Sequence, residues 1–189
     1  MLNSFFEQSE VHYSRIYRTF RRFETHRFFE DLFKKAVALL HKKEHLDISL
    51  IREAGTTTVV KTGDDNLGFN GYKYKTRGKV VAFCDRNCNV IFPFVSAPGN
   101  RNESPLFKAA LSQVMSTARI LRIDLAQTII SLDGMYDSHE NRKAICNRWM
   151  VLNIHKNLRE KKIPKRGRKC LFDSSIFQER FNAIERAFA

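Results

Sequence analysis

The spacing of apolar residues divides the chain into a helical beginning and a longer part in which strands and helices alternate. Apolar residues recur every three or four positions from about Ser9 to Phe23 and again from about Arg27 to Lys43. This spacing is typical of amphipathic helices. Several arginines lie between the apolar residues of the first helix. We therefore expect residues 1–45 to form an N-terminal helical region.

The composition changes near residue 46, where β-branched residues become frequent. Such residues predict strands. The first strand is expected within Leu46–Lys61, followed by a glycine-bearing loop over Thr62–Gly78. Two further strands, Lys79–Cys84 and Asn89–Val95, are separated by Asp85-Arg86-Asn87-Cys88. A short polar segment between two strand-like runs predicts a β-hairpin.

Helices and strands alternate in the rest of the chain. We expect a helix over Glu103–Leu121, a strand over Gln127–Leu132, a helix over Ser138–Asn147 and a strand over Trp149–Ile154. A last helix is expected to begin near Asp173. Three strands followed by alternating helices and strands predict an α/β domain, a mixed sheet flanked by helices. This is also the element order of the ribonuclease-H-like fold, which we expect for residues 46–189.

The charge of the chain indicates its partner. Lysine and arginine number 33 against 20 acids, a net charge of +13. Such an excess attracts polyanions, and nucleic acid is the leading candidate. No apolar run approaches the roughly 20 residues that span a bilayer, so we expect no membrane partner and a cytoplasmic, nucleoid-associated protein. The four cysteines lack zinc-site spacing and are expected to be reduced thiols.

Four motifs, in order, resemble those of the insertion-sequence DDE transposases. They are Ala54-Gly55-Thr56-Thr57-Thr58-Val59, then Gly68-Phe69-Asn70-Gly71-Tyr72-Lys73 with Ala97-Pro98-Gly99-Asn100 downstream, then Leu132-Asp133-Gly134-Met135-Tyr136-Asp137-Ser138, and finally Ile184-Glu185-Arg186-Ala187-Phe188. They span nearly all of the chain after residue 46. Each falls on the expected element, and their order makes the resemblance more specific than any single motif.

The resemblance implies an enzyme that binds transposon ends and catalyses metal-dependent strand cleavage and transfer. Such chemistry uses two Mg²⁺ or Mn²⁺ ions, held by three acids from separate elements, to stabilise the attacking and leaving oxygens at phosphorus. The family's second and third acids correspond to Asp133 and Glu185, which are therefore the expected catalytic residues and metal ligands. We expect the first-acid position, residue 54, to lie beside Asp133 on a neighbouring strand.

Two departures from the family pattern predict an impaired copy. Ala54 stands where the family has its first aspartate, and alanine cannot ligate a metal. Glu53 is adjacent, but successive strand side chains point to opposite faces, so it would need a bulge near Gly55 to reach the site. The chain also ends shortly after Glu185, which we interpret as a C-terminal truncation.

A basic segment lies between the second and third acids. Residues 156–169 hold eight basic side chains and one acid, a density that suits backbone phosphates. We expect DNA contacts from Lys161, Lys162, Lys165, Arg166, Arg168, Lys169 and Arg180. Arg180 precedes Glu185 by five residues instead of the family's four, which turns it off the glutamate's face of a helix.

The expected partner is double-stranded DNA, both transposon ends and target, and a homodimer is left open. One alternative function is a non-catalytic DNA-binding derivative of a transposase. Another is an unrelated basic RNA-binding module, which explains the charge but not the ordered motifs.

Overall fold

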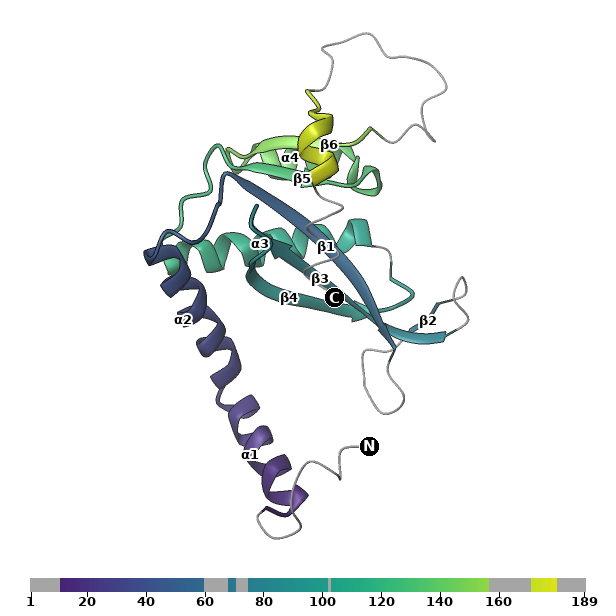
Figure 1. Ribbon diagram of the computed structural model, residues 1–189. Coiled ribbons are helices and arrows are strands. Elements are labelled where there is room, and N and C mark those ends of the chain that lie inside the picture. Colours follow the sequence, from purple (N-terminus) through teal and green to yellow (C-terminus); the bar gives the residue numbers. More distant parts are fainter. Residues whose placement is uncertain (1–10, 60–67, 71–74, 102, 157–170, 180–189) are drawn as a thin grey trace.

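A computed structural model describes residues 11–59, 68–70, 75–101, 103–156 and 171–179 (Figure 1). Its elements are a sheet and the helices around it. The strands are β1 Leu50–Val59, β2 Gly68–Asn70, β3 Lys75–Cys84, β4 Val90–Pro98, β5 Ile129–Leu132 and β6 Val151–Ile154. The helices are α1 Tyr13–Thr25, α2 Phe28–Lys42, α3 Glu103–Leu121, the 3-10 turn η1 Gly134–Tyr136, α4 His139–Cys146 and a last helix over 174–179.

The strand order is β2-β3-β1-β5-β6, with β4 also paired to β3. Strands β1, β3 and β4 form antiparallel neighbours, whereas β5 lies parallel to both β1 and β6. The parallel pairs need crossover connections, which α3 and α4 supply. This order and these directions are those of the ribonuclease-H-like fold, so the predicted fold class is confirmed.

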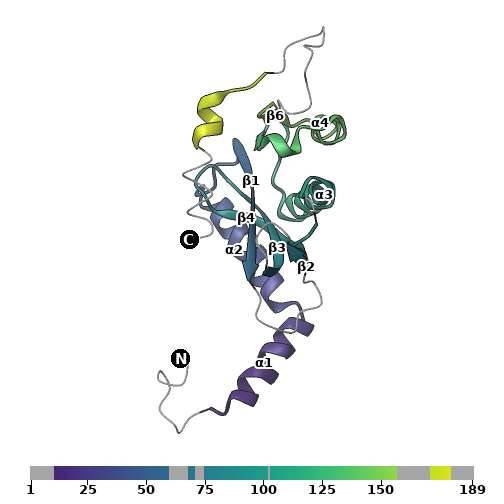
Figure 2. The ribbon, with the colours of Figure 1, turned by 90° about the vertical axis from the view of Figure 1, so that its right-hand side faces the viewer.

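Helices cover both faces of the sheet. Figure 2 shows α3 and α4 on one side and the helix 174–179 on the other. Aromatic rings fill the α3 side, where Phe107 lies 6.3 Å from Phe83 and 5.4 Å from Tyr136 between ring centroids. The buried Val37 brings α2 into the same core.

The predicted elements agree closely with the observed ones, and the largest difference concerns β3. That strand begins at Lys75 rather than at Lys79, and β2 precedes it within the expected loop. Both extra segments lie on polar sequence that pairs through its backbone: Lys75 pairs with Asn70, and Arg77 with Val59 and Gly68. Ladder hydrogen bonds need no apolar side chain, so the apolar pattern could not predict this extension.

The first helix is where it was predicted, but its apolar stripe is not in the core. No residue of α1 is buried. Figures 1 and 2 show α1 and α2 running one after the other away from the sheet. Their junction is held by aromatic side chains, with Phe23 stacked on Phe28 at a centroid distance of 4.8 Å.

The cysteines within the described residues, Cys84, Cys88 and Cys146, carry free thiols. Burial raises the pKa of Cys84 to about 11, so this thiol stays protonated near neutral pH. Among the described helices, none is both long and apolar enough to cross a membrane.

Candidate functional site

Asp133 lies at the carboxyl end of β5. The strand itself is largely buried, and the chain emerges at Asp133, whose side chain is exposed. Its carboxylate accepts a hydrogen bond from the backbone N–H of Gly134 and so caps η1. Aspartate before glycine favours such a turn. The same local geometry also presents a carboxylate at the end of a central strand, as a metal ligand would require.

Residue 54 lies on the strand next to Asp133. The parallel ladder between β1 and β5 pairs Leu50 with Ile129 and Arg52 with Ser131. Continued by two residues, this register brings Ala54 level with Asp133. Neighbouring strands lie about 4.8 Å apart. Residues 54 and 133 are 79 positions apart in the sequence, and they correspond to the first and second acids of the transposase motifs. The continued register would bring them next to each other in the sheet.

Glu53 points away from this place. Its side chain is 1% exposed, and its Oε1 accepts a hydrogen bond of 2.7 Å from the Tyr136 hydroxyl on the α3 side of the sheet. The register between β1 and β3 is continuous from Arg52 to Val59. The bulge near Gly55 that would turn Glu53 toward the face of Ala54 is therefore absent from this part of the described chain.

Arg52 on β1 binds the last helix. Its Nη2 donates to Oε2 of Glu179 at 2.7 Å, and its Nη1 donates to the backbone oxygen of Arg86 at 3.0 Å. Arg86 also binds Glu179. Its Nε donates to Oε2 at 3.1 Å and its Nη2 donates to Oε1 at 2.8 Å. The hydrogen bonds that Arg86 donates to the Glu179 carboxylate raise the pKa of Arg86. Two guanidinium groups therefore share one carboxylate, and the side chain of Arg52 is only 1% exposed.

The amino end of the same helix is fixed to β6. The amide of Asn153 accepts from the backbone N–H of Asp173 at 2.9 Å and donates to its carbonyl at 3.1 Å. The Asp173 carboxylate accepts hydrogen bonds from Ser175 and from the Ile176 N–H, which lowers its pKa and caps the helix. Phe177 stacks on His155 with a centroid distance of 5.3 Å. Residues 173–179 are thus held to the sheet by β6 and by Arg52 and Arg86.

The last three residues of the motif that contains Asp133 each make a structural contact. Tyr136 binds Glu53, Asp137 pairs with Arg142 at 2.8 Å, and the Ser138 hydroxyl caps α4 by accepting from the Asn141 N–H. These contacts fix the turn that presents Asp133. The motif is recognisable in the sequence, but the hydrogen bond to Glu53 is not, because an acid within a strand does not reveal its partner.

The two halves of the glycine-rich motif also meet. A Cβ atom added to Gly68 would lie 2.4 Å from Oδ1 and 2.9 Å from the backbone nitrogen of Asn100. Only glycine fits there without displacement of Asn100. Gly68 and Asn100 are thus in close contact although 31 residues lie between them in the sequence.

The other predicted site residues fall outside the described part of the chain. These are Glu185 and the expected DNA contacts, Lys161, Lys162, Lys165, Arg166, Arg168, Lys169 and Arg180. The sequence prediction did not select Arg52, Arg86 or Glu179. The available signal was an arginine that follows the apolar Leu50 and Ile51 at the start of β1.

The described residues do not fit a two-metal centre. Within them, no group of three or more histidine, cysteine, aspartate or glutamate side chains could hold a metal ion. Asp133 is at the right edge of the sheet, but alanine at position 54 supplies no oxygen and Glu53 lies on the other face. Asp137, the next acid along the chain, is engaged by Arg142.

Comparisons with known proteins give one structural likeness. No protein-family model matches the chain, and no curated protein matches it. A solved piggyBac transposase, in a synaptic complex with hairpin DNA, is similar at 13% sequence identity and a TM-score of 0.47. The likeness covers 65% of this chain but only 27% of that chain. The ribonuclease-H-like fold of the present chain rests on its own strand order and directions.

Proposed function

We propose that the chain is the core region of an insertion-sequence DDE transposase that binds double-stranded DNA and is impaired in catalysis. The observation that carries the proposal is the parallel ladder between β1 and β5, whose register, continued by two residues beyond Arg52 and Ser131, would bring Ala54 level with Asp133. These are the positions of the first and second acids in the transposase motifs. In this proposal residues 1–45 form the N-terminal region and residues 46–189 the core.

The impairment follows from the ligands that remain. In an intact enzyme of this class, paired Mg²⁺ or Mn²⁺ ions stabilise the charge that develops in strand cleavage and transfer. Here Asp133 and Glu185 are the proposed metal ligands and catalytic acids, with no carboxylate at position 54. Because the described residues do not fit the metal pair, we expect weak metal binding and little cleavage.

DNA binding does not depend on the missing acid. The net charge of +13 provides long-range attraction to phosphates. The proposed contacts are Lys161, Lys162, Lys165, Arg166, Arg168, Lys169 and Arg180. The proposed partners are transposon ends and target DNA, in the cytoplasm at the nucleoid.

A second candidate function is a non-catalytic DNA-binding derivative of a transposase. The specific observation that favours it is the direction of Glu53, which lies buried against Tyr136 and cannot substitute for the missing acid without a rearrangement of β1. Such a protein could occupy element ends without cutting them. Cleavage separates the two candidates, because only the first predicts residual metal-dependent activity.

The shared part of both candidates is tested by the binding of a DNA duplex at increasing salt. Affinity should fall steeply between about 50 and 200 mM salt, since phosphate contacts release counterions. A variant with three charges reversed in the basic segment should bind more weakly and with a shallower salt slope. The variant is Lys165→Glu, Arg166→Glu and Lys169→Glu.

A matched control reverses three exposed charges elsewhere, which lowers the net charge equally. It is Arg119→Glu, Arg122→Glu and Lys143→Glu. If both triple variants lose the same affinity, the attraction is general and the basic segment is not the DNA-binding site. Binding that does not change with salt would contradict the proposal for DNA as a whole.

A further inference from the structure

Two arginines, one on β1 and one in the turn after β3, converge on a single carboxylate. Oε2 of Glu179 accepts hydrogen bonds from Nη2 of Arg52 and Nε of Arg86, and Oε1 accepts one from Nη2 of Arg86. The two guanidinium groups carry two positive charges, whereas the carboxylate supplies one negative charge. Glu179 therefore balances only half of the charge of the arginine pair.

The carboxylate uses the donors of the two arginines unequally. In each guanidinium group, Nε and Nη2 form one donor edge that can bind two oxygens side by side. Arg86 binds both oxygens of Glu179 through this edge, but Arg52 uses only its Nη2. The Nε of Arg52 is buried and has no acceptor among the described residues. Because a buried donor without an acceptor is unfavourable, an occupant with a further oxygen would bind better than the carboxylate.

A second buried polar group without a partner lies beside Arg52. Ser131 on β5 is the partner of Arg52 in the parallel ladder, so the two side chains start from the same face of the sheet. The Ser131 hydroxyl is buried and makes no hydrogen bond within the described part of the chain. Asn153, the ladder partner of Ser131 on β6, binds Asp173 at the start of the last helix. The polar row beneath residues 173–179 thus holds two unpartnered groups, and both can donate a hydrogen bond.

The acids near Arg86 do not supply the missing acceptor. The Asp85 carboxylate accepts hydrogen bonds from the backbone N–H groups of residues 47 and 89 and from the side-chain amide of residue 89. The Asp47 carboxylate accepts from the backbone N–H and the hydroxyl of Ser49. Neither carboxylate bonds to either guanidinium group within the described ranges. Glu179 is the acid that binds both of them there.

The position of Glu179 allows its side chain to be replaced by a ligand. The side chain of Glu179 is 37% exposed and that of Arg86 is 45% exposed, whereas Arg52 lies buried beneath them. The start of the last helix has attachments of its own, to Asn153 and to His155. The carboxylate can therefore swing into solvent while the start of the helix stays on the sheet.

A phosphate group matches the two arginines better than a carboxylate does. Its oxygens point to the corners of a tetrahedron, so different oxygens can face the donor edges of Arg52 and Arg86. Arginine binds phosphate through parallel N–H donors, as it binds carboxylate. The unused Nε of Arg52 would gain an acceptor, and a dianion would balance both guanidinium charges.

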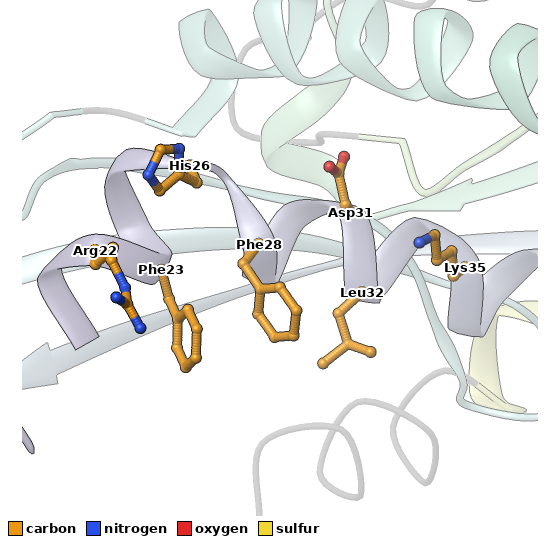
Figure 3. A pocket seen from close by; sticks show the side chains of 7 residues that line it. All are labelled: Arg22, Phe23, His26, Phe28, Asp31, Leu32 and Lys35. Carbon is orange, nitrogen blue, oxygen red and sulfur yellow. The ribbon is translucent and has the colours of Figure 1, made fainter. Parts of the chain in front are cut away.

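A second group of cations on the chain lacks these features. In Figure 3, Arg22 and Lys35 lie at the two ends of a pocket of about 430 Å³ at the junction of α1 and α2, with Phe28 and Leu32 between them. Both cations are exposed, so water already solvates them. Exposed charges of this kind attract any anion weakly, and the pocket therefore provides a control position.

We propose that Arg52 and Arg86 form a phosphate-binding site, which Glu179 fills when no ligand is present and from which a bound phosphate group displaces the Glu179 carboxylate. The proposal does not rest on DNA binding or on catalysis, and its probe is inorganic phosphate without DNA. Calorimetric titration of the full chain, with phosphate replacing chloride at constant ionic strength, measures the binding. Glu179→Gln removes the competing charge and keeps the size of the side chain, so this variant should bind phosphate at least tenfold more tightly than the unaltered chain.

Arg86→Gln removes one of the two guanidinium groups at an exposed position. Combined with Glu179→Gln, it should abolish the gain in phosphate affinity. Two controls make the same changes of charge elsewhere. They are Glu24→Gln, which breaks an exposed ion pair on α1, and Arg22→Gln in the pocket of Figure 3. Each should change the affinity by less than about twofold. Equal affinity in all these proteins would mean that the general positive charge attracts phosphate, and it would overturn the proposal.

Hydrogen exchange tests the displacement of Glu179 separately. In the unaltered chain, saturating phosphate should accelerate exchange of the backbone amides of residues 174–179, because the carboxylate no longer holds the end of the helix. Chloride at the same ionic strength should have no such effect, and phosphate should cause no further acceleration in Glu179→Gln. Phosphate that binds without altering this exchange would occupy another place, which would contradict the proposed site.

Dimethyl phosphate distinguishes two sources of the phosphate group. It is a diester with two free oxygens, like the backbone of a nucleic acid, whereas inorganic phosphate resembles a free phosphate or the phosphorylated end of a strand. Binding of both probes to Glu179→Gln, lost when Arg86→Gln is added, would show that the site accepts a backbone phosphate. Binding of inorganic phosphate alone would restrict it to free or terminal phosphate. If neither probe binds more tightly to Glu179→Gln than to the unaltered chain, the arginine pair is a purely structural clamp.

Discussion

The hydroxyl of Tyr136 donates a hydrogen bond of 2.7 Å to Oε1 of Glu53, and each residue is 1% exposed. This contact joins the middle of β1 to the turn that follows β5. The turn presents Asp133, and Ala54 follows Glu53 directly on β1. A buried acid that sequence reasoning considered as a replacement ligand therefore serves to fix the relative position of two strands.

Tyr136→Phe should destabilise the fold. The substitution keeps the ring but removes the hydroxyl, so the buried Glu53 carboxylate loses a donor. Leaving a buried polar group short of a partner costs about 1–3 kcal/mol. The free energy of unfolding, measured with urea, should fall by this amount. Tyr17→Phe, at an exposed position on α1, is the control and should change stability by less than about 0.5 kcal/mol.

Glu179→Gln should loosen the last helix from the sheet. The change removes the carboxylate that Arg52 and Arg86 share, and it leaves the buried guanidinium of Arg52 without its counter-charge. Because Glu179 is itself 37% exposed, we expect a loss of only about 1–2 kcal/mol, less than for a fully buried pair. Hydrogen exchange of the backbone amides of residues 174–179 should accelerate by roughly tenfold.

The control for this helix is Glu24→Gln, which removes an exposed ion pair with Arg21 on α1. Pairs of that kind contribute less than about 1 kcal/mol, and exchange in residues 174–179 should not change. Equal exchange in the Glu179 variant and the unaltered chain would mean that Asn153 and His155 hold the helix alone.

The sequence predicted the elements correctly where the apolar spacing of a segment matches the face that is buried in the fold. Helix α3 has the predicted bounds, because its apolar spacing is also its buried face. The hairpin between β3 and β4 follows from a polar turn between two apolar strands, and Cys88 takes the left-handed conformation there, with φ of 71°. The order of these elements was sufficient for the sheet topology.

The sequence was less informative where long-range pairing decides the outcome. Nothing near Arg52 indicated that its partner would be Glu179, 127 residues later. The apolar stripe of α1 predicted a helix correctly but not its exposure, because periodicity reports which face is apolar and not what covers it. Residue 54 was identified through the family motif, and its position beside Asp133 is a continuation of the register that pairs Arg52 with Ser131.

Gly68→Ala should destabilise the packing of β2. The added Cβ would overlap both the side chain and the backbone nitrogen of Asn100, so rotation of the amide alone cannot relieve it. We expect a loss of about 1–3 kcal/mol, the usual range for an added methyl group in a tight site. Adding Asn100→Ala should recover part of this loss, because one of the two overlaps disappears. If Asn100→Ala restored the whole free energy of unfolding, the contact with the backbone nitrogen would not contribute to the loss. If Gly68→Ala alone caused no loss of stability, the close approach of Gly68 and Asn100 would be contradicted.

Ala54→Asp should give the chain a metal affinity that the unaltered chain lacks. The register of β1 on β5 brings residue 54 level with Asp133, so two carboxylates would face one ion, and hard divalent cations prefer such oxygen ligands. Calorimetric titration with Mn²⁺ measures the binding directly, without a need for turnover. In Ala54→Asn the side chain has nearly the shape of aspartate without its charge, and this variant should bind Mn²⁺ at least tenfold more weakly than Ala54→Asp. The same weakening is expected for Ala54→Asp combined with Asp133→Asn.

The unaltered chain and these three variants, assayed for cleavage of a DNA duplex with Mg²⁺ or Mn²⁺, separate the two candidate functions. An unaltered chain that binds Mn²⁺ and cuts DNA as well as the aspartate variant would mean that residue 54 is not the first-acid position, and that another acid of the chain completes the site.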